Sequence, residues 1–134
     1  EVEKLPHPER VHFAGFRNDA PAVMAASDIC VLPCLDGEGL SRAVIEAMAY
    51  GVPAIVTPVG GNTELIVDGE CGLVVPVGDE AALAEAMERL CDADLRQTMG
   101  AAARERIARE FRIDTTIDRT LALYQEILAE GGPA

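Results

Sequence analysis

Two glutamates, Glu38 and Glu46, are separated by seven residues in a stretch that passes from a glycine-flanked loop into a helix. The apolar run 28–32 precedes them, and its β-branched residues are typical of a buried parallel strand. This order places Gly39 and Leu40 at the carboxyl end of a strand and the amino end of a helix. Ligands bind at that edge of an open α/β sheet. The free N–H groups of a first helical turn suit an anion such as a pyrophosphate.

The surroundings of Glu38 favour an ordinary structural role. Glu38 lies between Gly37 and Gly39 at the expected start of the helix, and Asp36 is close by. An acidic residue at that point complements the helix dipole and can cap the first turn. Judged on its local sequence alone, Glu38 is therefore predicted to be a cap.

Glu46 is the only charged residue in the otherwise apolar helical segment 43–49, so its carboxylate needs a partner. Arg42, four residues earlier, is one candidate, although an arginine preceding a glutamate is the weaker orientation and contributes only about a few tenths of a kcal/mol. A pair of vicinal hydroxyls, as on a ribose, is the other candidate. The spacing alone does not separate the two.

Five linked motifs run through the chain in a fixed order: Glu38-Gly39, Glu46-Ala-Met-Ala49, Gly51-x-Pro53, Gly60-Gly61-x-x-Glu64 and Gly72-Leu-x-Val75. Together they resemble the donor-side signature of the retaining family 4 glycosyltransferases, the group 1 transferases of GT-B fold. The resemblance covers nearly the whole chain. A run of five motifs is far more specific than any one of them.

The resemblance implies a role for each residue of the central stretch. Glu38 would reach the hydroxyls of the donor sugar and act in catalysis by orientation and charge stabilisation, without covalent attack. Glu46 would hold the ribose, and the backbone amides near Gly39, Leu40 and Ser41 would meet the diphosphate. Many members of the family have Gly-Phe-Gly where this chain has Gly39-Leu40-Ser41, which leaves the sugar preference open.

A second glycine pair, Gly60 and Gly61, lies between an expected strand at 53–57 and an expected helix at 63–67. The local sequence predicts that both glycines adopt positive φ and that Asn62 caps the helix. The resemblance places this loop beside the donor, where the glycines would shape the pocket and Glu64 would brace it through hydrogen bonds.

The remaining segments supply scaffold. Further strands are expected at 11–14, with His12 half-buried on an edge, at 29–32 and at 72–75, and a short helix at 19–26 with Asp19 as N-cap. Helices fill the chain from residue 79, and we expect three apolar stripes at helical spacing to face the core. The stripes are Leu83, Ala86, Met87 and Leu90; Leu95, Met99, Ala102 and Ile107; and Ile113, Ile117, Leu121, Tyr124 and Leu128.

Charged side chains are expected to face solvent along one of these helices. The arginines Arg104, Arg106, Arg109 and Arg112 alternate with glutamates, which predicts a solvated surface. Near the site we expect only Arg42 and Arg17 as basic residues. Neither takes the place of the arginine and lysine that neutralise the diphosphate in the family.

Composition restricts the class of protein. The chain has 134 residues, 49% hydrophobic and 4% aromatic, which fits one helix-rich α/β domain. The net charge of −12 argues against nucleic acid and against direct contact with an anionic membrane. The four cysteines form no C-x-x-C motif, which argues against zinc and, with the apolar composition, against a disulfide framework. We therefore expect a reducing, cytoplasmic location, with any approach to a membrane made through another domain.

The sequence thus predicts an α/β fold with a Rossmann-like parallel sheet flanked by helices, part of the C-terminal half of a GT-B glycosyltransferase. Residues 1–134 would form an N-terminally truncated nucleotide-sugar-binding domain. By resemblance, the full enzyme would move a hexosyl unit, with retention and without a metal, from a nucleoside diphosphate sugar to a sugar or lipid-linked acceptor, as in polysaccharide biosynthesis. The acceptor would bind a missing N-terminal domain. A non-catalytic nucleotide-binding module and a plain interaction domain are the alternatives.

Overall fold

The computed structural model describes residues 2–37 and 39–129. Three short strands form a parallel sheet in the order β1 (Cys30–Leu32), β2 (Ala54–Val56) and β3 (Gly72–Val74). Helices separate the strands along the chain, as parallel pairing requires. The predicted Rossmann-like sheet flanked by helices is therefore confirmed.

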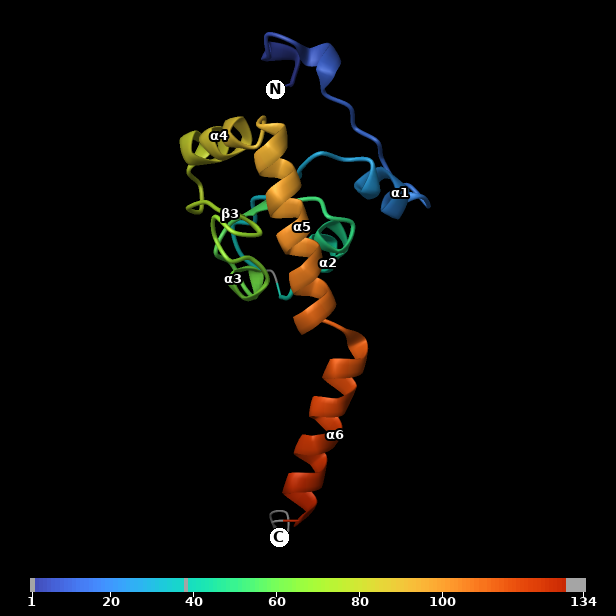
Figure 1. Cartoon of the computed structure of the whole chain (residues 1–134). Helices are drawn as coiled ribbons and strands as arrows, with labels where there is room; N and C mark the ends of the chain where they lie inside the picture. Colours follow the sequence, from blue (N-terminus) through green and yellow to red (C-terminus); the bar gives the residue numbers. More distant parts are fainter. Residues whose placement is uncertain (1, 38, 130–134) are drawn as a thin grey trace.

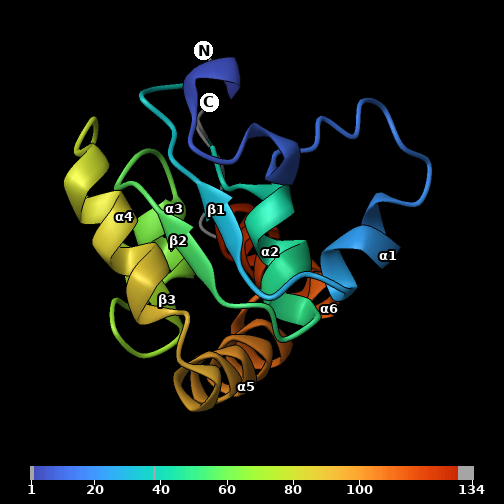
Figure 2. The same cartoon turned by 90° about the horizontal axis from the view of Figure 1, so that it is seen from above.

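The helices cover both faces of the sheet. Two 3-10 turns, Val2–Lys4 and Pro8–Arg10, precede the helices α1 (Ala20–Ala25), α2 (Arg42–Ala49), α3 (Asn62–Leu65), α4 (Glu80–Arg89), α5 (Ala93–Glu110) and α6 (Ile113–Ala129). Figure 2 shows the sheet between α4 on one side and α2 on the other. The site must therefore lie at an end of the sheet, because its faces are occupied.

The central strand β2 is buried on both faces and divides the core in two. Ala54 and Val56 belong to a cluster with Val44 and Met48 of α2, whereas Ile55 belongs to a second cluster with residues of β3, α4 and α5. Successive side chains of a strand point to opposite faces. This alternation explains why an uninterrupted apolar run such as Ala54–Val56 forms a central parallel strand.

Most predicted elements are present with shorter bounds, but the strand expected at 11–14 is wrong. Val11 has an extended backbone, with φ −100° and ψ 118°, yet this segment pairs with no strand in the described part of the chain. Phe13 is 85% exposed, and His12 is exposed instead of half-buried. A strand needs a hydrogen-bonded neighbour, and residue type alone does not supply one.

The apolar stripes agree with the structure for α5, in part for α4, and not for α6. Met99 and Ile107 are buried in the core, and so are Ala86 and Leu90, but Met87 is 45% exposed. The third stripe is wrong as a core prediction, because every member is at least half exposed: Ile113, Ile117, Leu121, Tyr124 and Leu128. Figure 1 shows α6 continuing from α5 away from the sheet. Helical spacing indicates an amphipathic helix without indicating what covers it.

Close contact between α2 and α5 depends on two glycines. Gly51 follows Tyr50, the C-cap of α2, with φ +79°, a conformation that glycine commonly adopts just after a helix. Gly100 lies buried in the middle of α5 against it, and a Cβ atom on Gly100 would overlap the carbonyl oxygen of Gly51. The position of α5 over α2 therefore requires glycine at residue 100.

Gly100→Ala tests this contact, because helix propensity and packing predict changes of opposite sign in the free energy of unfolding. Alanine is intrinsically about 1 kcal/mol better than glycine inside a helix. The overlap with Gly51 predicts the reverse, a loss of about 1–3 kcal/mol in the free energy of unfolding, measured by urea denaturation. The exposed Gln97→Ala on the same helix is the control, with an expected change within about 0.5 kcal/mol. A stabilised Gly100→Ala variant would contradict the proposed packing.

Candidate functional site

The candidate site lies where the three parallel strands end. A cavity of about 230 Å³ opens there, and residues that follow each strand line it, among them Pro33, Thr57 and Pro76, together with Asp79 at the start of α4. In an open parallel sheet, this carboxyl edge is where ligands bind. The structure therefore places the beginning of the loop after β1, at Pro33 and Leu35, at the expected edge.

Two hydrogen bonds join the loop after β1 to the loop after β2. The Thr57 hydroxyl donates to the carbonyl oxygen of Cys34 over 2.7 Å, and the Gly61 N–H donates to the carbonyl oxygen of Gly39 over 3.0 Å. Thr57 is only 2% exposed, so its bond is shielded from water. Together the bonds fix the course of the loop that leads into α2.

Gly61 permits this close approach for a reason that differs from the predicted one. Gly60 has the expected positive φ of +58°, but Gly61 has φ −84°. A Cβ atom on Gly61 would lie 2.8 Å from Cδ1 and 3.4 Å from Cα of Leu40. A side chain at residue 61 would thus displace that of Leu40, whereas the backbone conformation of Gly61 itself does not demand glycine.

The predicted cap of α3 is also corrected. Gly61 is the N-cap residue, and Asn62 is the first residue of the helix. Asn62 is completely buried, and its Nδ2 donates to the carbonyl oxygen of Thr57 over 3.1 Å. In the described part of the chain, its Oδ1 has no hydrogen-bond partner. The sequence predicted no role in the site for Thr57. Its position as a polar residue at the end of an apolar strand was the one feature of the sequence that could have indicated such a role.

The amino end of α2 differs from those of α4 and α5. Asp79 accepts a bond from the Ala82 N–H, and Asp92 accepts bonds from the first turn of α5. Ser41, the N-cap residue of α2, is 2% exposed and makes no capping bond with its side chain. The first-turn N–H groups of α2 thus receive no side-chain acceptor from their cap, which suits an anion at that position.

Glu46 lies on α2 beyond this amino end and is paired with Arg42. Arg42 Nε donates to Glu46 Oε1 over 2.8 Å, and the two side chains are 91% and 36% exposed, respectively. The first of the two predicted partners is therefore present. Glu38, the other acidic residue of the motif, lies outside the described residues.

Glu64 contributes to this region through its backbone. Its N–H donates to the carbonyl oxygen of Gly61 over 3.0 Å, and its own carbonyl accepts a bond from Arg106 over 2.8 Å. Arg106 was expected on a solvated face, but its side chain is only 19% exposed. That prediction is wrong for Arg106, whereas Arg104 and Arg109 are exposed as expected. Alternating charge does not identify which arginine faces a buried carbonyl.

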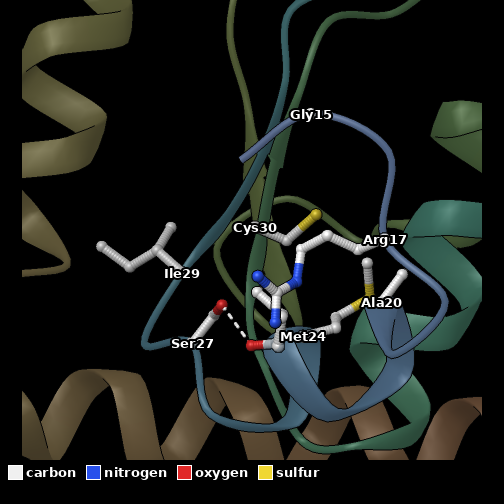
Figure 3. A pocket seen from close by; sticks show the side chains of 8 residues that line it. Gly15, Arg17, Ala20, Met24, Ser27, Ile29 and Cys30 are labelled. Carbon is white, nitrogen blue, oxygen red and sulfur yellow. Dashed lines mark hydrogen bonds between the residues drawn. The ribbon is translucent and has the colours of Figure 1, made fainter. Parts of the chain in front are cut away.

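Arg17 lies away from the site. It lines a cavity of about 350 Å³ together with Met24, Ile29 and Cys30, at the amino end of β1 (Figure 3). Its guanidinium donates to both carboxylate oxygens of Asp19 over 2.9 and 2.6 Å. Burial raises the pKa of the Cys30 thiol, so the thiol in this cavity stays protonated at neutral pH. The cavity lies at the opposite end of the strand from the loop 33–41.

Among residues 2–37 and 39–129, no group of three or more His, Cys, Asp and Glu side chains is placed to hold a metal ion. Within the same residues, no helix has the length and apolar character needed to cross a membrane.

A double-mutant cycle tests the contact between Gly61 and Leu40. Gly61→Ala should lower the free energy of unfolding by about 1–2 kcal/mol, because the new methyl group meets the Leu40 side chain. In a Leu40→Ala background the loss should shrink, which gives a coupling of at least about 0.5 kcal/mol in urea denaturation. Any change in capping cancels, because it is the same in both backgrounds. Strictly additive effects would show that the two loops do not touch there.

Comparison with known proteins identifies the family. Residues 1–93 match the family model described as Glycosyl transferases group 1. N-acetyl-alpha-D-glucosaminyl L-malate synthase of Bacillus anthracis is 34% identical over 130 residues, which cover 96% of this chain and 34% of that protein. UDP-Gal:alpha-D-GlcNAc-diphosphoundecaprenol alpha-1,3-galactosyltransferase of Escherichia coli is 32% identical, with 90% of this chain and 31% of that protein covered.

Solved structures agree with this result. Anabaena HepE in complex with UDP superposes with a TM-score of 0.83 at 30% identity, over 90% of this chain and 34% of that one. Sucrose-phosphate synthase of Thermosynechococcus elongatus gives 0.80 at 35% identity, over 92% and 31%. The chain spans about a third of the length of these relatives. From the family match and these relatives, the chain belongs to the group 1 glycosyl transferases.

Proposed function

We propose that residues 1–134 form the nucleotide-sugar-binding domain of a retaining glycosyltransferase. The whole protein would transfer a hexosyl unit from a nucleoside diphosphate sugar to a sugar or lipid-linked acceptor, without a metal ion, on the cytoplasmic side of the cell. Membership of the family supports the reaction class. A relative of the same fold that binds UDP-glucose supports the class of donor.

The amino end of α2 is the observation that carries this proposal. The chain has a net charge of −12, so an anionic ligand must be held by local groups and not by the overall field. The first-turn N–H groups of α2 receive no side-chain bond from the N-cap Ser41 in the described part of the chain, and they lie at the carboxyl edge of the sheet. In this position they would stabilise the negative charge that develops on a leaving diphosphate.

Glu46 would accept hydrogen bonds from the ribose hydroxyls. Its carboxylate shares one oxygen with Arg42 at an exposed position. An exposed ion pair of this kind contributes little to stability, so the pair leaves the carboxylate available to a ligand. Glu38, for which we propose contact with the donor sugar, would complete the motif.

Thermal shifts with UDP, GDP and ADP test the role of Glu46 in the protein that carries this chain. A nucleotide at 100 times its dissociation constant should stabilise the wild type by about 2.7 kcal/mol. Glu46→Gln should weaken that nucleotide about tenfold or more, because a charged acceptor of the ribose hydroxyls is lost.

Arg42→Gln is the matched control for this experiment, since it breaks the same ion pair and keeps the carboxylate. It should leave nucleotide affinity within about twofold, in line with the small energy of an exposed pair. Equal losses in the two variants would contradict a direct role for Glu46. A folded wild type that responds to none of the nucleotides would contradict the proposed function itself.

We also propose that further strands of the same domain continue the sheet beyond β1. β1 pairs only with β2 within the described residues, so its outer edge is open. A cavity lined by Ile29 and Cys30 lies beside β1, and Phe13 is exposed. Added strands would cover an edge that is otherwise open to association.

Amide hydrogen exchange at Val31 tests this extension in the full-length protein. The Cys30 N–H donates to Pro53 on the β2 side, so the N–H of Val31 points toward the open edge. If another strand pairs there, Val31 should exchange at least about a hundredfold more slowly than an unpaired amide, as core strands do. Rapid exchange at Val31, beside a protected Ile55 as internal control, would show that β1 is the true edge.

A further inference from the structure

Arg106 joins α5 to the end of α3 through two of its guanidinium nitrogens, and the third pairs with a glutamate of α5. Nε donates to the carbonyl oxygen of Leu65 over 2.9 Å, and Nη2 donates to that of Glu64 over 2.8 Å. Nη1 pairs with Glu110 over 2.9 Å. The guanidinium also lies over the Phe111 ring, 5.7 Å from its centroid. Its geometry is therefore fixed on several sides.

α3, the helix that Arg106 contacts, is too short to be stable without contacts from outside the helix. α3 has only four residues, far fewer than an isolated helix needs in water. Its last carbonyl groups have no partner within the helix, and a cation at that end complements the dipole. The partly buried Arg106 supplies both the hydrogen bonds and the charge.

α3 connects the Arg106 contacts to the loop at 39–41. Gly61, the N-cap of α3, donates its N–H to Gly39 and lies against Leu40, directly before the amino end of α2. One helical turn thus separates the carbonyls bound by Arg106 from the contact that sets the loop. Loss of the guanidinium frees the end of that turn and loosens the loop at the other end.

We propose that Arg106 is a positioning residue for the nucleotide site, acting through α3 on the loop at 39–41. It touches no ligand itself. The inference rests on the proposed function, because it assumes that this loop and the amino end of α2 bind the diphosphate.

The test compares Arg106→Lys and Arg106→Gln in the full-length protein, with Arg109→Gln as the matched control. Arg109 is exposed on the same helix and bonds only to Glu105 and Glu110 within the described residues. Lysine keeps the charge and most of the aliphatic stem but cannot span two carbonyls. Arg106→Lys thus separates the effect of the positive charge from that of the two hydrogen bonds to carbonyl groups. It can still be measured if Arg106→Gln fails to fold.

Two readouts are taken well below the melting temperature: amide exchange of peptides over 39–41 and 61–66 without ligand, and UDP affinity by calorimetry. We expect both Arg106 variants to exchange faster in both peptides and to bind UDP about tenfold more weakly, whereas Arg109→Gln matches the wild type. Wild-type UDP affinity in Arg106→Lys would contradict a role for the two hydrogen bonds that the guanidinium makes to the α3 carbonyls. Unchanged exchange at 39–41 with a lower melting temperature would reduce Arg106 to a structural role.

The same experiment separates failure of this inference from failure of the proposed function. If the folded wild type does not bind UDP, and neither GDP nor ADP replaces it, the proposed function is wrong and the positioning role for a nucleotide falls with it. If the wild type binds one of them and the Arg106 variants bind it equally well, only the inference is overturned.

Discussion

The hydrogen bond from the Gly61 N–H to the carbonyl of Gly39 is the contact on which the site depends. It brings the loop after β2 against the loop after β1, at a point where a side chain on Gly61 would displace that of Leu40. The loop after β1 then leads into α2, whose N-cap residue Ser41 makes no capping bond with its side chain. The two loops thus meet directly before the amino end of α2, where we propose that the diphosphate binds.

Three other contacts help to hold the two loops in this arrangement. Thr57 ties the same two loops together at a second point, where its hydroxyl meets the Cys34 carbonyl. Arg106 holds the far end of α3, and the Gly51–Gly100 contact sets α5, the helix that carries Arg106, against α2. Thr57, Gly100 and Arg106 lie outside the five motifs, yet their contacts help to restrict the position of the loop after β1.

The sequence predicted the order of strand, loop and helix because apolar runs and glycines report on local structure directly. It placed β1, α2 and β2 correctly for that reason, and it offered Arg42 as one of two candidate partners of Glu46. It did not predict the lack of pairing at 11–14, or the exposure of the α6 stripe, because both depend on neighbours that residue type does not reveal. The roles of Gly61, Asn62 and Arg106 also escaped it, since each is set by a contact between segments that are distant in the sequence or by local backbone geometry.

The central claim is that the amino end of α2 and Glu46 form the nucleotide site, and a crystal structure of the full-length protein with UDP tests it most directly. The account predicts diphosphate oxygens within hydrogen-bonding distance of the first-turn N–H groups of α2. It also predicts the ribose hydroxyls on the Glu46 carboxylate. UDP bound elsewhere, or bound at α2 with its ribose away from Glu46, would contradict the account.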